Sequence, residues 1–218
     1  MKYATLLPSN KKIPINTIFC VGQNYADHAK EMGGTVASSP VIFLKPSNAV
    51  IENGAPILLP KLSNNVHHEV ELTVLIGKGG RNISKADAMN HVAGYGVGLD
   101  MTMRDVQLAA KKSGNPWSIA KGFFTSAPLS PFVEASKILD PHQLDISLRV
   151  NGIERQKTNT AKMNFKVDDL IVFLSSVFSL EEGDIIYTGT PEGVAQVVPG
   201  DVLEAEIPGV AKIRHTVQ

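Results

Sequence analysis

Apolar positions along the chain fall into short runs separated by turn-forming residues. The runs are rich in β-branched residues and are bounded by Gly, Pro, Asn or Asp, a pattern that predicts strands. The predicted strands are Ile18–Val21, Val41–Leu44, Val70–Ile76, Tyr95–Leu99, Ile146–Val150, Ile185–Thr188 and Val202–Ile207. Within Leu148–Arg155, the pair Asn151-Gly152 predicts the two-residue turn of a hairpin.

Helical signals are fewer. Val167–Phe178 has apolar residues at helical spacing and two aspartates near its start. Asp105–Lys112 ends in two lysines followed closely by Gly114, and Ser84–His91 opens with a candidate Ser cap. This order of elements predicts a β-rich α+β fold, and we expect a single domain over residues 1–218. Residues 1–14 form a separate strand or an arm, and the sequence does not decide between these two.

Composition and charge narrow the class of protein. Hydrophobic residues make up 43% of the chain, and the 21 Lys and Arg residues balance the 21 Asp and Glu residues. The chain therefore has no excess of positive charge, and its composition does not indicate binding to nucleic acid or to an anionic membrane. The N-terminus lacks a signal-peptide pattern and no window is apolar enough for a membrane span. Cys20, the only cysteine, lies in an apolar run, so we expect a buried structural thiol in a soluble cytoplasmic protein.

Two acidic residues at the start of the predicted strand Val70–Ile76, one directly before it and one within it, form the most informative pattern. Glu69 and Glu71 stand two positions apart, so on a strand their side chains point to the same face. Carboxylates placed in this way repel each other unless a cation or proton lies between them. Asp100 follows the glycine-rich strand Tyr95–Leu99 and supplies a third carboxylate. Three carboxylates without a cysteine favour Mg²⁺ or Mn²⁺ over zinc.

Other interpretations of these segments stay open at this point. A Glu-x-Glu pair on a strand is commonly a solvated face, which needs no metal. His67-His68-Glu69 lacks the second His that the zinc-protease motif requires. Gly94-x-Gly96-x-Gly98 does not match G-x-G-x-x-G, and no helix opens inside it, so the run does not predict nucleotide binding.

Longer blocks of the chain resemble those of a known family. In order, they are Val21–His28, Phe43–Pro46, His67–Leu72, Gly94–Gly96, Leu99–Gln107, Pro116-Trp117, Ala120-Lys121 and Gly183–Val194. So many ordered blocks are more specific than any single motif. The chain resembles the fumarylacetoacetate hydrolase family, most closely its small single-domain members of the acylpyruvate hydrolase and oxaloacetate decarboxylase type. The resemblance favours the metal site over the solvated face.

The resemblance implies a fold, an assembly and a set of site residues. The family's fold is a mixed β roll with a few peripheral helices, usually assembled as a homodimer. Its three acidic metal ligands match Glu69, Glu71 and Asp100, and its catalytic His–Glu pair matches His28 and Glu31. Two residues three positions apart on a helical turn are neighbours, so this carboxylate can orient the imidazole as a general base.

We make further predictions for the segment around the His–Glu pair. We expect Asn24 to cap the short helix, and Gly33-Gly34 to act as the hinge of a lid that orders over the substrate. Gln23 stands where the family often has Arg or Ser, a departure that leaves the His–Glu pair intact. We also expect His68 to help orient a ligand carboxylate.

Other positions match the family's pocket. Lys121 matches an active-site lysine, which supplies positive charge to a developing enolate or to the substrate carboxylate. Arg104 and Gln107 lie one helical turn apart and can point together at the distal group of the substrate. Lys45 and Thr190 match pocket positions, and the backbone of the turn at Thr190 can hold a carboxylate.

The predicted reaction is cleavage of a carbon–carbon bond in a small 2-oxo acid, in which the cation stabilises a pyruvate enolate. For an acylpyruvate, His28 with Glu31 activates the attacking water; for oxaloacetate, loss of CO₂ generates the same enolate. The alternatives are an isomerase or decarboxylase of hydroxymuconate-type intermediates, or a fumarylpyruvate hydrolase, in aromatic degradation. The remote alternative is a metal-binding module without catalytic activity.

Overall fold

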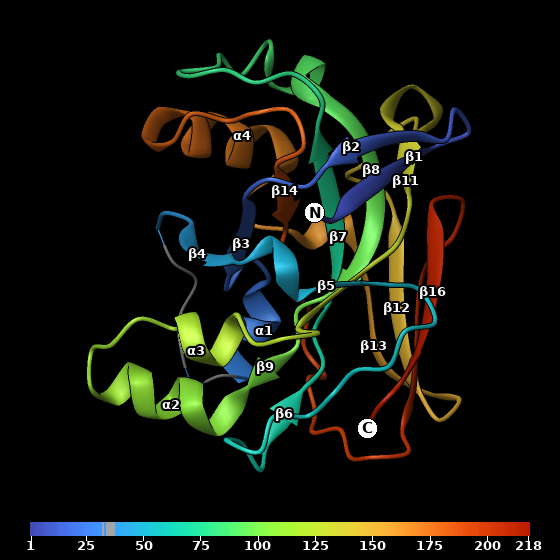
Figure 1. The fold of residues 1–218 in the computed structure, drawn as a ribbon. Helices are drawn as coiled ribbons and strands as arrows, with labels where there is room; N and C mark the ends of the chain where they lie inside the picture. The colour runs from blue at the N-terminus through green and yellow to red at the C-terminus, as the bar shows by residue number, and fades with distance from the viewer. Residues whose placement is uncertain (32, 34–37) are drawn as a thin grey trace.

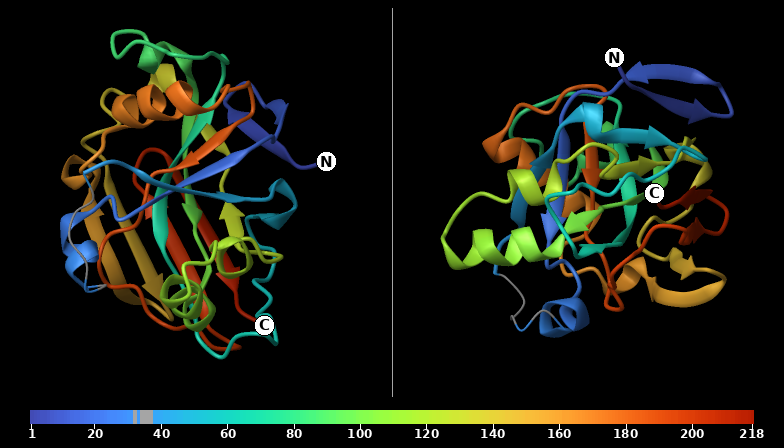
Figure 2. Two further views of the ribbon diagram at one scale, coloured as in Figure 1. Left: turned by 90° about the vertical axis from the view of Figure 1, so that its left-hand side faces the viewer. Right: turned by 60° about the horizontal axis from the view of Figure 1, so that its bottom comes forward.

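A computed structural model describes residues 1–31, 33 and 38–218 of the chain, and its centre is a curled mixed sheet (Figures 1 and 2). Eight strands follow the order β2-β1-β11-β8-β7-β14-β3-β4, and β10 pairs with both β5 and β8. The strands are β1 (Tyr3–Leu7), β2 (Lys11–Pro14), β3 (Ile18–Gly22), β4 (Val41–Lys45), β5 (Val50–Glu52), β7 (Val70–Ile76), β8 (Val92–Leu99), β10 (Ala127–Leu129), β11 (Phe132–Glu134) and β14 (Ile185–Tyr187).

The central strands β7 and β8 are the best buried part of the sheet. Every residue of β7 is buried, which explains its almost continuous run of apolar side chains. The two strands are antiparallel, with Val70 opposite Leu99 and Glu71 opposite Gly98. A Cβ at Gly98 would lie 2.6 Å from the Tyr187 ring, so the glycine lets β14 pack closely against the β7–β8 pair.

A second sheet packs against the first and closes the core. Its order is β13-β12-β15-β16, formed by β12 (Asp145–Val150), β13 (Ile153–Asn159), β15 (Val202–Ile207) and β16 (Ala211–Thr216). Side chains from both sheets, among them Leu72 and Leu148, share one hydrophobic cluster. The predicted hairpin is confirmed, since Asn151 and Gly152 both have positive φ values in the turn between β12 and β13.

The helices are peripheral, as the resemblance implied. They are α1 (Ala26–Glu31), α2 (Arg104–Lys112), α3 (Ser118–Lys121) and α4 (Val167–Val177). Figures 1 and 2 show α1, α2 and α3 gathered at one end of the sheets and α4 near the other end. Beside α2 lies the small pair β6 (Val66–His67) and β9 (Thr102–Met103). The helices predicted at 105–112 and 167–178 are confirmed.

The helix predicted at Ser84–His91 is wrong. The segment contains a turn and then a single 3₁₀ element, η2 (Ala88–His91). The Ser84 hydroxyl donates to the Asp87 carboxylate at 2.7 Å and accepts from the Asp87 N–H at 3.2 Å. These local bonds close a turn, which competes with helix formation for the same groups. Three more 3₁₀ turns occur in the described residues: η1 (Ser47–Ala49), η3 (Ala135–Lys137) and η4 (Thr160–Lys162).

The first residues of the chain form a hairpin at one edge of the large sheet. Strand β1 pairs antiparallel with β2 and parallel with β11, which ties the N-terminal segment to the fold (Figure 2). Of the two alternatives for residues 1–14, a strand or an arm, the structure therefore shows strands. Cys20 on β3 is fully buried, as expected for a structural thiol. None of the helices in the described residues is long and apolar enough to cross a bilayer.

Asp105 holds the start of α2 in place, and we expect its replacement to lower the free energy of unfolding by an amount that depends on pH. Its carboxylate accepts from the Ser63 hydroxyl at 2.6 Å and from the N–H groups of Asn64 and Val106. Burial raises the pKa of Asp105, but these hydrogen bonds outweigh it and hold the pKa below its ordinary value. A carboxyl group whose pKa is lower in the folded state stabilises the protein at pH values above its unfolded-state pKa. This stabilisation is lost as the pH falls through the folded-state pKa.

We therefore expect Asp105→Ala to lower the free energy of unfolding at pH 7 by about 1–2 kcal/mol. The difference from wild type should shrink as the pH falls below about 4. Urea unfolding of both proteins at pH 7 and at pH 3.5 measures it. A difference of equal size at the two pH values would contradict a role for the ionised carboxylate.

Candidate active site

Three buried carboxylates meet where strands β7 and β8 lie side by side. Glu69 directly precedes β7, Glu71 lies within it, and Asp100 directly follows β8. The Asp100 N–H donates to the Glu69 carbonyl at 2.8 Å, so strand pairing holds these two residues together. The carboxylates offer ligand oxygens that lie within 4.8 Å of one another. Val70 and Leu72 face the hydrophobic core, so the expected alternation of the two faces is observed.

The donor set fits a hard divalent cation. Three carboxylates are ligands of the type that Mg²⁺ and Mn²⁺ prefer. Glu71 accepts a hydrogen bond from the Gly189 N–H at 2.7 Å, but no cationic side chain of the described residues lies within 4.0 Å of it. Burial and the charges of Asp100 and Glu69 raise the pKa of Glu71 well above its ordinary value. A cation at this place would satisfy an otherwise unpaired buried carboxylate.

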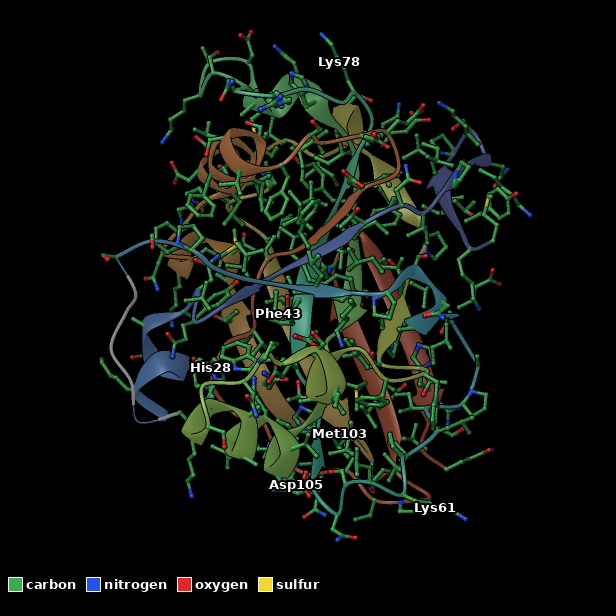
Figure 3. The ribbon with its side chains drawn as sticks, turned by 60° about the vertical axis from the view of Figure 1, so that its left-hand side comes forward. His28, Phe43, Lys61, Lys78, Met103 and Asp105 are labelled. Atoms are coloured by element: carbon green, nitrogen blue, oxygen red, sulfur yellow. The ribbon has the colours of Figure 1, made fainter. Side chains whose placement is uncertain are left out.

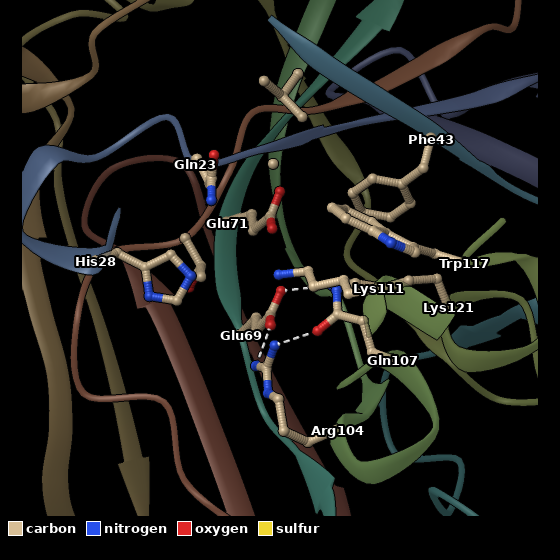
Figure 4. A pocket seen from close by; sticks show the side chains of 13 residues that line it. Gln23, His28, Phe43, Glu69, Glu71, Arg104, Gln107, Lys111, Trp117 and Lys121 are labelled. Atoms are coloured by element: carbon tan, nitrogen blue, oxygen red, sulfur yellow. Dashed lines mark hydrogen bonds and ion pairs between the residues drawn. The ribbon is translucent and has the colours of Figure 1, made fainter. Parts of the chain in front are cut away.

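Positive side chains balance the other two carboxylates. Lys121 Nζ lies 2.7 Å from Glu69 Oε2 and 2.6 Å from Asp100 Oδ2, and Arg104 also pairs with Glu69 (Figure 4). Burial raises the pKa of Glu69, but Lys121 and Arg104 outweigh this effect and hold it far below its usual range. Glu69 is therefore an anion at every physiological pH.

Lys45 pairs with the third carboxylate of the cluster, Asp100. Its ammonium is buried behind Asp100, 2.7 Å from Oδ1, and it donates to the carbonyls of Met101, Lys121 and Ser126. Lys45 does not line the pocket in front of the carboxylates. The substrate contact expected of Lys45 stays a prediction, and in this structure the ammonium holds Asp100 in place.

His28 lies on helix α1 (Figure 3), and its ring points toward Glu69 and Glu71 across the pocket (Figure 4). Its Nδ1 lies 3.2 Å from Glu31 Oε2, so the expected pair forms on helix α1. The Glu31 carboxylate also accepts from the Gly193 N–H at 3.1 and 3.2 Å. This second contact ties α1 to the loop after β14 and orients Glu31 toward the imidazole. His28 is only 7% exposed, which shields the ring from bulk solvent.

Asn24 does not cap this helix as expected. In the described structure its buried side chain donates to the carbonyls of Phe165 and Thr188 and accepts from the Phe165 N–H at 2.7 Å. These bonds use the amide to join three distant segments, and sequence spacing does not reveal them. The hinge predicted at Gly33-Gly34 falls partly outside the described residues, because Gly34 is not described.

Helix α2 brings Arg104 and Gln107 together. Arg104 donates to Gln107 Oε1 at 2.7 Å, and both side chains line the pocket. Thr190 also lines it, and its hydroxyl donates to the Val70 carbonyl at 2.9 Å. Gln156, on the second sheet, donates to the Thr190 hydroxyl at 2.8 Å and lies 3.0 Å from His68 Nδ1. His68 is therefore oriented by Gln156, which sequence reasoning missed.

Further residues line the pocket, and of these only Gln23 was singled out from the sequence, as a departure from the family's pattern. Gln23, Phe43, Lys111 and Trp117 line it together with the residues above. The Phe43 and Trp117 rings lie 5.6 Å apart, and Lys111 Nζ lies 4.9 Å from the centre of the Trp117 ring. Gln23 adopts a positive φ of 59°, which is uncommon for a residue with a side chain. The family-like blocks contain Gln23, Phe43 and Trp117, but they assign no chemistry to them.

Sequence comparison places the chain among known enzymes. Residues 17–218 match the family model described as "Fumarylacetoacetate (FAA) hydrolase C-terminal". The chain is 52% identical over 201 residues to mitochondrial oxaloacetate tautomerase FAHD1 of Mus musculus, covering 92% of this chain and 91% of the mouse protein. The human protein of that name is 50% identical over the same length, with the same coverage.

Structural comparison agrees. Fumarylpyruvate hydrolase from Pseudomonas aeruginosa, in complex with Mn²⁺ and pyruvate, superposes with a TM-score of 0.96 at 38% identity, covering 99% of this chain and 95% of that chain. The 5-carboxymethyl-2-hydroxymuconate delta-isomerase from Mycobacterium smegmatis gives a TM-score of 0.84 at 38% identity, covering 94% of this chain and 80% of that chain. The predicted strand-rich α+β fold is therefore confirmed. Together, these matches show that the chain belongs to the fumarylacetoacetate hydrolase family.

Proposed function

We propose that this chain is an enzyme that uses a divalent cation to cleave a carbon–carbon bond in a small 2-oxo acid. One observation carries the proposal: Glu69 and Glu71 of the carboxylate cluster line the same pocket as the buried His28, whose imidazole pairs with Glu31. The relatives support it, because the Pseudomonas aeruginosa fumarylpyruvate hydrolase was solved with Mn²⁺ and pyruvate, a 2-oxo acid. A metal-binding module without activity needs no His28 oriented by Glu31.

Glu69, Glu71 and Asp100 would hold the cation, which we propose to be Mg²⁺ or Mn²⁺. When bound, it supplies a Lewis acid for the oxygens of the 2-oxo acid. Arg104 and Gln107 line the same wall and would orient the substrate by hydrogen bonds. Lys121 lies beside Glu69 and Asp100, so its ammonium would stabilise negative charge that develops on the substrate.

His28 would act as the general base in hydrolysis of an acylpyruvate. Its Nε2 would take a proton from water, whose oxygen attacks the distal carbonyl carbon, and Glu31 holds the ring through Nδ1. The bond between that carbon and its neighbour then breaks. The acyl part leaves as a carboxylic acid, and the electron pair of the broken bond becomes the enolate of pyruvate, which takes up a proton. The buried position of His28 excludes bulk water from the imidazole.

A second candidate reaction is tautomerisation of oxaloacetate, favoured by the 52% identity to the mouse enzyme of that name. It moves a proton between the carbon next to the 2-oxo group and the oxo oxygen, and no carbon–carbon bond breaks. Decarboxylation of the same substrate breaks the bond to the distal carboxylate instead. All three reactions need stabilised negative charge on the 2-oxo oxygen, which the pocket's cationic side chains would supply.

Product analysis separates these reactions. With Mg²⁺ or Mn²⁺, we expect the protein to release pyruvate from acetylpyruvate, and chelator should abolish this release. Oxaloacetate is followed in parallel by the absorbance of its enol and by pyruvate formation. Loss of the enol without pyruvate would favour the tautomerase, and pyruvate from oxaloacetate alone would favour the decarboxylase. No metal-dependent change in any substrate would overturn the proposal.

Two further expectations stay predictions. The cytoplasmic location rests on the sequence alone, and the mouse and human relatives are named as mitochondrial proteins. The homodimer rests on the family resemblance, and the size of the protein in solution, measured by light scattering, tests it.

A further inference from the structure

Lys111 is the one pocket residue of helix α2 that the proposed reaction does not use. Arg104, Gln107 and Lys111 occupy positions i, i+3 and i+7 of α2, so they form a row along one face of the helix, and all three line the pocket. Arg104, the first residue of this row, pairs with Glu69. Lys111 lies two turns farther along, about 10.5 Å at a rise of 1.5 Å per residue. The row therefore lines the pocket along two turns of α2, beginning at the carboxylates.

The ammonium of Lys111 lacks an anionic partner. Within the described part of the chain, no carboxylate lies within 4.0 Å of it, whereas Lys121, Arg104 and Lys45 all pair with acidic residues. Its Nζ instead lies over the Trp117 ring at 4.9 Å (Figure 4 shows both side chains on one wall). Stacking on the ring restricts where this exposed side chain can go and keeps it beside the pocket.

The surroundings of Lys111 are positive. Burial lowers the pKa of Lys111, and the charges of Arg104 and Lys121 lower it further, whereas the charge of Glu69 partly opposes them. With a divalent cation held by the three carboxylates, the pocket carries an excess of positive charge. A substrate with one carboxylate offsets only part of that excess, and a substrate with two carboxylates offsets more of it.

We propose that Lys111 binds the distal carboxylate of the substrate and makes the enzyme prefer 2-oxo dicarboxylates over 2-oxo monocarboxylates. The proposal rests on the proposed function, because it places the 2-oxo end of the substrate at the carboxylate cluster. The distal end then extends along α2 past Gln107 and reaches Lys111. The ammonium acts as a point charge that needs no fixed geometry, so it can accept distal carboxylates of different length.

Binding of unreactive ligands tests the proposal without catalysis. The pair 2-oxoglutarate and 2-oxopentanoate has the same chain length and differs only in the distal carboxylate. Titration calorimetry with Mg²⁺ gives the Kd of each for wild type, Lys111→Met and Lys111→Glu. The matched control is Lys112→Met, which removes the neighbouring exposed lysine that does not line the pocket.

We expect wild type to bind 2-oxoglutarate at least about 10-fold more tightly than 2-oxopentanoate, a difference of ~1.4 kcal/mol. Lys111→Met should remove this preference by weakening only the dicarboxylate, Lys111→Glu should reverse it, and Lys112→Met should leave it unchanged. Equal binding of both ligands by wild type, or a preference that survives in Lys111→Met, would overturn the proposal.

The same variants distinguish this proposal from the proposed function. If Lys111→Met loses the dicarboxylate preference while wild type turns over no 2-oxo acid, the proposed reaction fails and the role of Lys111 stands. If wild type cleaves its substrates and Lys111→Met keeps the ratio of kcat/KM between oxaloacetate and acetylpyruvate, the role of Lys111 fails and the reaction stands.

Discussion

Glu71→Gln is expected to abolish divalent-cation binding while leaving the metal-free protein at least as stable as wild type. Glu71 has no cationic partner among the described residues, and burial beside Asp100 and Glu69 disfavours its charge. A neutral amide removes this repulsion, and its oxygen can still accept from the Gly189 N–H. Replacing groups around metal ligands lowers affinity about 10–100-fold, so loss of a ligand itself should cost at least ~100-fold.

Three measurements check this result. Titration calorimetry with Mn²⁺ should show the loss of affinity, and pyruvate release should fall in parallel. Thermal unfolding in chelator should give a Tm equal to that of wild type or higher, since removal of about 1 kcal/mol of repulsion raises Tm by about 2–4 °C in a chain of this size. Asp100→Asn is the contrasting variant, because it deprives both Lys45 and Lys121 of a buried partner and should lower Tm. A Glu71→Gln protein that binds Mn²⁺ like wild type would show that Glu71 is not a ligand.

His28→Ala is expected to lower kcat for acetylpyruvate hydrolysis about 10²–10⁴-fold, the usual contribution of a general base. The imidazole faces the carboxylates and is oriented by Glu31, which the Gly193 N–H holds in turn. Oxaloacetate decarboxylation needs no attacking water, so it should fall much less. Steady-state kinetics on both substrates, at saturating Mg²⁺, gives the comparison.

Lys30→Ala is the matched control, because Lys30 lies on the same helix with its side chain exposed and outside the pocket. It should retain wild-type rates, and both variants should bind Mn²⁺ normally. An equal loss on both substrates in His28→Ala would instead indicate a proton transfer that the two reactions share. Wild-type hydrolysis in His28→Ala would rule out its role as the base.

Much of the carboxylate cluster was predictable from local sequence. The twofold repeat of a strand puts Glu69 and Glu71 on one face whatever the rest of the fold does, and two such carboxylates demand a cation or proton. Asp100 at the end of a glycine-rich strand extended this pattern. The strong apolar runs also predicted the central strands and helix α4, because burial and amphipathicity leave a regular period in the sequence. Helix α2 was predicted from the two lysines and Gly114 at its C-terminal end.

Tertiary structure decided which side chains meet. The pairing of β7 with β8 brings Asp100 to Glu69, and no local pattern specifies that register. Lys45 sits behind Asp100 and Asn24 joins distant segments, because their partners are backbone groups far away in sequence. For the same reason Gln156 and Lys111 left no signal: a buried amide or an unpaired lysine is defined by its surroundings. Local periodicity thus determined the elements and the paired carboxylates, whereas long-range packing built the pocket around them.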